Sequence, residues 1–267
     1  MQPPSTQNPA TNLALDLWFA HPADLLDPAV EAACAAILDN AERARAACFH
    51  LDRHRREFLA THALMRIALS HAHPAQPQSW SFSLNSYGKP SPVPDCGLRF
   101  NQSNSVELVV CLTARNHSHP AAVPEVGVDV EPFARAAEIV PLAPRVFSAA
   151  ERVQLDALPA ASRPDRALSL WTLKEAYIKA RGMGLRLPLQ RISFLFDGPH
   201  TIRFRADPGV DPDPGRRRFC HFDYAGHRIA LAVESAAAPI MNLFTARPPL
   251  APPSALALDP PSWFPEA

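Results

Sequence analysis

The spacing of hydrophobic positions divides the chain into two halves of similar plan. Leucines at every second position predict a first strand over 13–20, because successive strand side chains point to opposite faces. Apolar residues at three- and four-residue steps predict helices instead. The first half reads, in order, as strand 13–20, helices 28–47 and 52–70, and strands 80–84 and 106–113. Pro90, Pro92 and Pro94 predict a loop over 86–97.

The second half repeats this order of elements. It reads as strand 126–131, helices near 137–146 and 148–158, a long helix 164–181, strand 192–196, and a closing hairpin of 220–224 and 227–233. In each half a long helix is followed by a short strand. This likeness predicts an internal duplication, and so an α/β (α+β) fold built from two similar subdomains.

Composition sets the expected boundaries of the two halves. Residues 1–12 are polar and contain proline, so we expect a disordered tail. The N-terminal subdomain is expected over 13–122 and the C-terminal subdomain over 123–235. Prolines accumulate over 236–267, which predicts an extended or loosely attached C-terminal tail.

Candidate chemistry lies on strand 126–131 and the long helix 164–181. Valines alternate with the other residues of the strand, so Asp129 and Glu131 point to the same face. Two carboxylates on a half-buried strand repel each other and lose hydration, and a divalent cation would compensate. Glu175 would complete a magnesium site that also accepts phosphate oxygens. The alternative is that Asp129 and Glu131 lie at a solvated end of the strand and bind no metal.

Composition also narrows the class of function. Lys plus Arg and Asp plus Glu are 26 each in 267 residues, which favours neither nucleic acid nor a membrane surface as partner. No apolar run approaches the ~18 residues of a membrane span, and the N terminus lacks the pattern of a signal peptide. The five cysteines are scattered without a Cys-x-x-Cys pair, as in reduced proteins. We therefore expect a cytoplasmic protein, and the composition is typical of a bacterium with a GC-rich genome.

Five ordered segments spread over most of residues 49–195 carry a family pattern. They are Tyr87-Gly88-Lys89-Pro90, Phe100-Asn101-Gln102-Ser103-Asn104-Ser105, Gly127-Val128-Asp129-Val130-Glu131, Phe147-Ser148-Ala149-Ala150-Glu151, and Trp171-Thr172-Leu173-Lys174-Glu175-Ala176 with Lys179. Together they resemble the 4′-phosphopantetheinyl transferases, particularly the larger, surfactin-synthetase-activating type. The resemblance implies a pseudo-twofold pair of α/β subdomains with the active site at their junction, in a protein that is usually monomeric.

The activity implied by this resemblance is the transfer of the 4′-phosphopantetheine arm of coenzyme A. The acceptor is a serine hydroxyl of an acyl, peptidyl or polyketide carrier protein, and adenosine 3′,5′-bisphosphate is released. Fatty acid, polyketide and nonribosomal peptide carriers all remain open. A carrier protein is expected to dock on basic and apolar residues near 182–186.

The resemblance also assigns roles to individual residues. Asp129, Glu131 and Glu175 would supply the magnesium ligands, with the ion bridging the pyrophosphate oxygens of coenzyme A. Lys179 would reach the pyrophosphate. Glu151 matches a glutamate proposed as the general base toward the serine. Its segment is also a good capping box, and a magnesium-bound water relaying to Glu175 is the other candidate for the base.

Contacts to coenzyme A are implied at several further positions. These are Arg53, Gly88, Lys89, Pro90, Asn101, Ser103, Asn104, Lys174 and Lys179. Lys174 reads equally well as a solvated helix lysine. The sequence departs from the family at Asn104, where the family has a histidine associated with the 3′-phosphate. Because Asn cannot give the charge-assisted hydrogen bond of a protonated histidine, we expect weaker or less pH-dependent binding of coenzyme A.

Two other functions would use the same residues. A magnesium-dependent phosphohydrolase or nuclease could use the carboxylates, but a nuclease should carry a basic face that the neutral charge balance does not support. A catalytically drifted relative that only binds carrier proteins is suggested by Asn104 alone. On the helix by itself, Glu175 and Lys179 would indicate no more than a stabilising surface pair.

Overall fold

The computed structural model describes residues 13–116, 119, 121, 123–198, 201–247, 254–256 and 261–264. The tail expected at 1–12 lies outside these residues. The N-terminal half contains β1 (Leu13–Ala20), α1 (Pro28–Ile37), α2 (Asn40–Ala47), α3 (Asp52–Ala72), β2 (Ser81–Leu84), β3 (Pro90–Val93), β4 (Leu98–Asn104) and β5 (Val109–Asn116).

The C-terminal half and the segment after it follow in chain order. They contain β6 (Val126–Pro132), α4 (Ala136–Ile139), α5 (Ala143–Val146), α6 (Ala149–Asp156), α7 (Arg163–Arg181), β7 (Ile192–Phe196), β8 (Ile202–Ala206), β9 (Arg217–Tyr224), β10 (His227–Glu234), β11 (Ile240–Thr245), β12 (Ser254–Ala255) and β13 (Trp263–Phe264). The expected mixture of helices and strands is confirmed. None of the described helices is both long and apolar enough to cross a bilayer.

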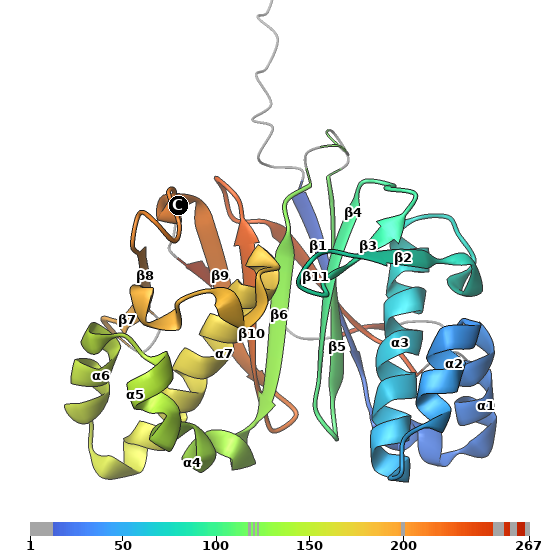
Figure 1. The fold of residues 1–267 in the computed structure, drawn as a ribbon, viewed down its shortest axis with the longest axis horizontal. Coiled ribbons are helices and arrows are strands. Elements are labelled where there is room, and N and C mark those ends of the chain that lie inside the picture. The colour runs from blue at the N-terminus through green and yellow to red at the C-terminus, as the bar shows by residue number, and fades with distance from the viewer. Residues whose placement is uncertain are drawn as a thin grey trace, which may run out of the picture.

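The two halves share one topology, which Figure 1 shows as two neighbouring sheets, each with a long helix. One sheet has the order β12-β11-β1-β5-β4, and the other has the order β13-β9-β10-β6. Thus β1, β5 and β4 correspond to β6, β10 and β9, and α3 corresponds to α7. Each long helix is followed by a two-stranded ribbon, β2–β3 or β7–β8. The expected internal duplication is therefore present in the topology.

The structure differs from the expected elements in the N-terminal half. The helix expected over 28–47 breaks after Ile37, because Asp39 caps α2 and forms a capping box with Glu42. The loop expected over 86–97 contains β3, whose prolines are tolerated because β3 pairs only with β2. β4 lacks a regular hydrophobic alternation, and sequence patterning did not predict it.

The C-terminal segment is not the loosely attached tail that its prolines predicted. β11 runs parallel to β1 in the N-terminal sheet, where Met241 and Leu243 are buried (Figure 1). β13 pairs with β9, and Phe264 stacks on Phe219. In the described part of this segment the apolar residues of β11 and β13 are extended and paired in spite of the nearby prolines, and each of the two sheets gains a strand from it.

The junction of the two sheets lies between β4 and β6. The outer edge of β6 is closed by side chains of β4: the amide oxygen of Asn101 accepts the Val128 N–H at 2.9 Å, and the hydroxyl of Ser103 accepts the Val130 N–H at 3.3 Å. Asn101, expected as a coenzyme A contact, therefore satisfies a strand edge. This junction brings residues of the two halves together.

The long helix α7 lies unusually close to β6. A Cβ atom on Gly127 would stand 2.0 Å from the Ala176 carbonyl oxygen and 2.3 Å from the Ala180 nitrogen. The helix has Pro164 in its first turn and ends at Gly182, whose φ of +60° is typical of glycine at a helix end. The close approach places the polar face of α7 over the carboxylates of β6.

Candidate active site at the junction of the two halves

Three elements bring a lysine, a serine and an aspartate into direct contact. The Lys179 ammonium on α7 donates to the Asp129 carboxylate on β6 at 2.7 Å and to the Ser103 hydroxyl on β4 at 2.7 Å. Ser103 donates to the same oxygen of Asp129 at 3.1 Å. Three of the predicted site residues thus converge where the halves meet.

Glu131 extends this cluster along β6. Its carboxylate accepts a hydrogen bond from the Trp171 indole N–H at 2.8 Å and forms an ion pair with Arg135. The Arg135 guanidinium lies 5.7 Å from the centre of the Trp171 ring. Sequence reasoning missed Arg135, although its place four residues after Glu131 could have suggested the pair.

Burial and neighbouring negative charges disfavour the ionised forms of Glu131 and Glu175 and so raise their pKa values. Burial raises the pKa of Glu175 to about 7, and the negative charges of Asp129 and Glu131 contribute to the rise. Burial and the charge of Asp129 also raise the pKa of Glu131. The second oxygen of Asp129, Oδ2, is buried and has no hydrogen-bond partner among the described residues. A bound cation would neutralise this buried negative charge and would give the unsatisfied oxygen a partner.

The residues present fit a magnesium ion, although their side chains are turned toward protein partners. Among the described residues, no group of three His, Cys, Asp or Glu side chains is arranged to hold a metal ion. Lys179 and Arg135 instead occupy oxygens of Asp129 and Glu131. The donor set is all oxygen, as magnesium prefers, and the unsatisfied Oδ2 of Asp129 offers one ligand. The magnesium site remains a prediction.

Glu151 and Lys174 form a separate buried ion pair. The Lys174 ammonium lies 2.8 Å from Glu151 and donates to two backbone carbonyls after α7, each at 2.7 Å. Glu151 accepts the N–H groups of Ser148 and Phe194 at 2.7 and 2.8 Å, which completes a capping box. Burial raises the pKa of Glu151 and lowers that of Lys174. This geometry contradicts the phosphate contact expected of Lys174 and favours the structural alternative for Glu151.

Lys89 reaches the end of α7 and not the Asp129 cluster. Its ammonium donates to two backbone carbonyls, at the start of β6 and the end of α7, at 3.0 and 3.3 Å, and it pairs with Glu125. Burial lowers the pKa of Lys89. The preceding Gly88 has a φ of +88°, and Pro90 begins β3. The turn is thereby fixed to α7, and its contact with coenzyme A remains a prediction.

Asn104, the residue that departs from the family pattern, has a hydrogen-bond partner that the sequence did not reveal. Asn104 donates to the carboxylate of Glu57 on α3, which also contacts His54 at 3.4 Å. These three residues line a cavity of about 280 Å³ beside β4. Arg53 is exposed at the start of α3 and points its guanidinium toward His54. An acidic group therefore stands next to the position where the family has its histidine.

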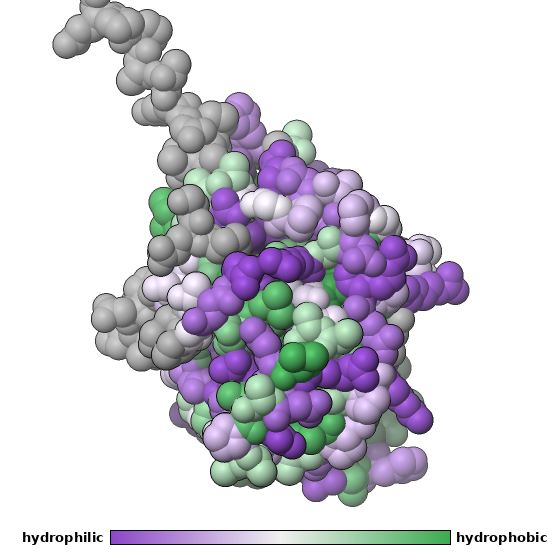
Figure 2. Space-filling view, turned by 90° about the vertical axis from the view of Figure 1, so that its left-hand side faces the viewer, coloured by the Kyte–Doolittle hydropathy of each residue, from purple (hydrophilic) through white to green (hydrophobic). Residues whose placement is uncertain are grey.

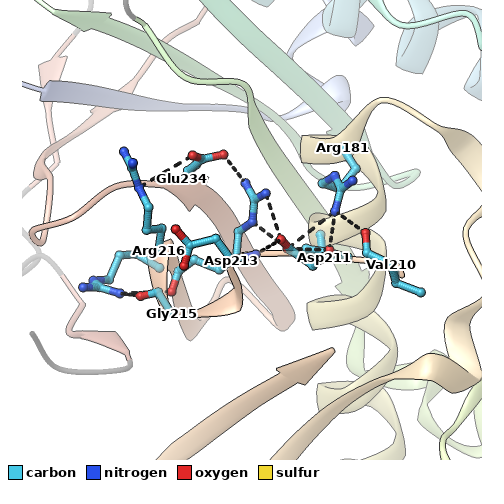
Figure 3. A network of polar contacts seen from close by, with 10 residues as sticks. Arg181, Val210, Asp211, Asp213, Gly215, Arg216 and Glu234 are labelled. Carbon is cyan, nitrogen blue, oxygen red and sulfur yellow. Dashed lines mark hydrogen bonds and ion pairs between the residues drawn. The ribbon is translucent and has the colours of Figure 1, made fainter. Parts of the chain in front are cut away.

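A buried carboxylate fixes the last turn of α7. Asp211 accepts from the Tyr177 hydroxyl at 2.8 Å and from Arg217 at 2.7 Å, and it pairs with Arg181 at 3.5 Å. Glu234 on β10 also accepts a hydrogen bond from Arg217, at 2.7 Å. Figure 3 shows Glu234, Asp211 and Arg181 in this network. The network connects α7 to β9 and β10, which sets the position of the helix that carries Glu175 and Lys179.

Comparison with known proteins gives consistent matches. A model of the 4′-phosphopantetheinyl transferase superfamily matches residues 125–232. The chain is 34% identical over 154 residues to the 4′-phosphopantetheinyl transferase HetI of Nostoc sp., with 57% of this chain and 62% of that protein covered. It is 33% identical over 131 residues to the 4′-phosphopantetheinyl transferase Sfp of Bacillus subtilis, with 49% and 54% covered.

A longer match extends over most of the chain. The chain is 31% identical over 210 residues to a phosphopantetheinyl transferase of Thraustochytrium sp., with 74% of this chain and 69% of that protein covered. The chain spans less than two thirds of the length of the Nostoc and Bacillus relatives. The match to the Thraustochytrium protein is long enough to assign the family.

Proposed function

We propose, from the premise that the chain belongs to the 4′-phosphopantetheinyl transferase superfamily, that it transfers the phosphopantetheine arm of coenzyme A to a carrier protein. The observation that supports this most directly is the meeting of Asp129, Lys179 and Ser103 at the junction of the halves. Glu131 and Glu175 add two further carboxylates with raised pKa values. Such a cluster combines ligands for a cation with a positive charge for a phosphate.

The reaction exchanges one phosphorus–oxygen bond for another. The serine oxygen of the carrier forms a bond to the phosphorus that bears the phosphopantetheine arm. The bond from this phosphorus to the bridging oxygen breaks, and the electron pair leaves with adenosine 3′,5′-bisphosphate. A bound magnesium ion, held by Asp129, Glu131 and Glu175, would neutralise charge on the pyrophosphate.

The chain's own residues position the reactants and take the proton. Lys179 faces the site from α7 and can move from Asp129 to a phosphate oxygen, because both partners are anionic. Ser103 holds Lys179 and Asp129 in register, and Trp171 orients Glu131. Glu151 is engaged by structural donors, so Glu175 is the carboxylate of the cluster that we assign to hold the serine proton.

The finer features of this function follow from the arrangement of the chain. Both sides of the junction come from one polypeptide, so we propose that the protein acts as a monomer. The expected substrates are acyl, peptidyl or polyketide carrier proteins in the cytoplasm. The scattered cysteines, without a Cys-x-x-Cys pair, support a reducing compartment.

Intact mass spectrometry of a carrier protein tests this function. An apo carrier is incubated with the chain, coenzyme A and magnesium, with and without a chelator. The expected result is a chelator-sensitive gain of one phosphopantetheine arm, about 340 Da, on the acceptor serine. No gain on fatty acid, polyketide and nonribosomal peptide carriers would contradict the proposal and favour a relative that only binds carriers.

A further inference from the structure

A second cavity lies in the C-terminal half, away from the carboxylate cluster. Its volume is about 690 Å³, and it is bounded by the first turns of α7, the β7–β8 ribbon, β9, the start of β10 and β13. None of the predicted site residues is among the described residues that line it. Figure 2 views the molecule from the side of the C-terminal half, where hydrophobic and hydrophilic residues are interspersed. The cavity therefore needs an explanation of its own.

Arg166 brings to this cavity a positive charge that has no ion-pair partner among the described residues. The carbon of its guanidinium lies 3.8 Å from the centre of the Phe196 ring, so one face of the group is stacked on an aromatic surface. Arg166 forms no ion pair with the described carboxylates. Burial lowers the pKa of Arg166; the negative charge of Asp165 opposes this shift, and the positive charge of Arg228 adds to it. Stacking leaves the N–H edge of the guanidinium available to an anion in the plane of the group.

His221 also lines this cavity, and one of its ring nitrogens is unsatisfied. Its ring meets the edge of Phe196 at a centroid distance of 6.4 Å. The Nε2 atom is buried and has no hydrogen-bond partner in the described part of the chain. Because buried polar atoms in native proteins nearly always have a partner, this nitrogen points to a bound molecule. Burial and the charges of Arg228 and Arg166 lower the pKa of His221 to about 3.

The other cations of the cavity are already neutralised. Arg228 pairs with Asp223 at 2.6 Å and with Asp165 at 2.9 Å. Arg203 pairs with Asp197. Among the described lining residues, Arg166 is therefore the arginine without an ion-pair partner, and the rings of Phe196 and Trp263 give the cavity apolar walls.

We propose that this cavity binds a small organic anion, a phosphate or carboxylate attached to an aromatic or other apolar body. The anion accepts hydrogen bonds from the N–H edge of Arg166 and from the Nε2 side of His221. The apolar body lies between the rings of Phe196 and Trp263, in a cavity of the size that small ligands fill. This site shares no residue with the proposed transferase site, so the two proposals are tested independently of each other.

Calorimetric titration with phenyl phosphate and benzoate tests the proposal and compares the two kinds of anion. We expect saturable binding of at least one probe and a change in the fluorescence of Trp263. Arg166→Gln keeps the planar shape without the charge and should weaken binding about tenfold or more, because a charge-assisted hydrogen bond is lost. The control Arg152→Gln, on the exposed face of α6, should bind like the unmodified chain.

Two further variants locate the bound probe. Trp263→Phe should remove the fluorescence change and leave calorimetric binding nearly intact. Lys179→Gln should leave binding unchanged, because Lys179 lies in the other site. Circular dichroism checks that each variant folds, and Arg166→Lys replaces Arg166→Gln if the latter does not. Absence of saturable binding, equal binding by Arg166→Gln, or loss of binding in Lys179→Gln would each overturn the proposal.

Discussion

At the scale of single residues, Glu175 should limit the stability of the protein without magnesium. Its pKa in the folded chain is about 7, above the ordinary 4.5. The stability that depends on its protonation is therefore complete below about 4.5 and is lost as pH rises through 7. Glu175→Gln should raise the unfolding free energy at about pH 8 in chelator, and this gain should vanish below about pH 4.5. Chemical denaturation across this pH range measures it.

The same substitution should abolish the proposed magnesium-dependent transfer, because it removes one of the three proposed magnesium ligands. Glu107→Gln is the matched control, since Glu107 is exposed between β4 and β5, and it should change neither stability nor transfer. Full activity in Glu175→Gln would remove Glu175 from the proposed ligands. If the stability of Glu175→Gln depended on pH in the same way as that of the original protein, the cluster would not raise the pKa of Glu175.

Asn104 gives a second prediction at this scale. In Asn104→His the new imidazole would stand beside Glu57, whose negative charge favours the protonated form and raises its pKa above the ordinary ~6.5. Coenzyme A should therefore bind more tightly at about pH 6, and this gain should be lost as pH rises and the imidazole loses its charge. Calorimetry on either side of neutral pH measures it. Asn104→Gln should add no pH dependence, and the same absence in Asn104→His would place this residue away from the phosphates.

At the scale of elements, the contact of α7 with β6 should tolerate no side chain at residue 127. Gly127→Ala would place a methyl group 2.0 Å from the Ala176 carbonyl oxygen, and backbone atoms cannot move aside as a flexible side chain can. The helix must shift, so we expect a loss of stability of about 1–3 kcal/mol or more and a large loss of transfer activity. Gly198→Ala, with no close neighbour at its Cβ position, should behave like the original protein in thermal melting and transfer assays.

The buried pair of Glu151 and Lys174 connects α6 to α7 and should be structural. Glu151→Gln would leave the Lys174 ammonium buried without its counter-ion, which should cost about 3–5 kcal/mol. Replacing both, as Glu151→Leu with Lys174→Met, removes the uncompensated charge but leaves the backbone groups that the pair had satisfied without partners, so it should restore only part of the stability. Thermal unfolding measures both variants. If the double variant folds but no longer transfers, Glu151 would regain the role of general base.

The limits of sequence reasoning can be traced to particular elements. Periodicity found β1, β6 and α7, since their apolar residues recur at the strand or helix period. It missed β3 and β4, although each pairs with a neighbouring strand in the sequence, because β3 contains two prolines and β4 lacks a regular hydrophobic alternation. Motif order predicted that Asp129 and Lys179 would share a site. It could not predict that Lys174 would turn inward, because the direction of a side chain depends on packing that no local pattern records.

At the scale of the whole molecule, one hydrophobic core joins the two sheets. Leu15 and Leu112 of the N-terminal sheet pack in the same cluster as Val128 and Leu231 of the C-terminal sheet. β11 strengthens this union, because it follows the C-terminal half in the chain yet pairs with β1. The halves therefore have similar topologies but are not independent, and the site between them depends on both.

This dependence predicts that damage to β11 unfolds the entire molecule in one step. Leu243 is 5% exposed, so Leu243→Ala should cost about 2–5 kcal/mol, whereas Ile240→Ala in the same strand, 59% exposed, should cost far less. Fluorescence of Trp18 in the first half and Trp171 in the second should report the same denaturation midpoint in each variant, as a single cooperative transition requires. Two separate midpoints in Leu243→Ala would contradict this, since the first half would then unfold alone and the cluster at the junction would lose Ser103 while keeping Asp129 and Glu175 in place.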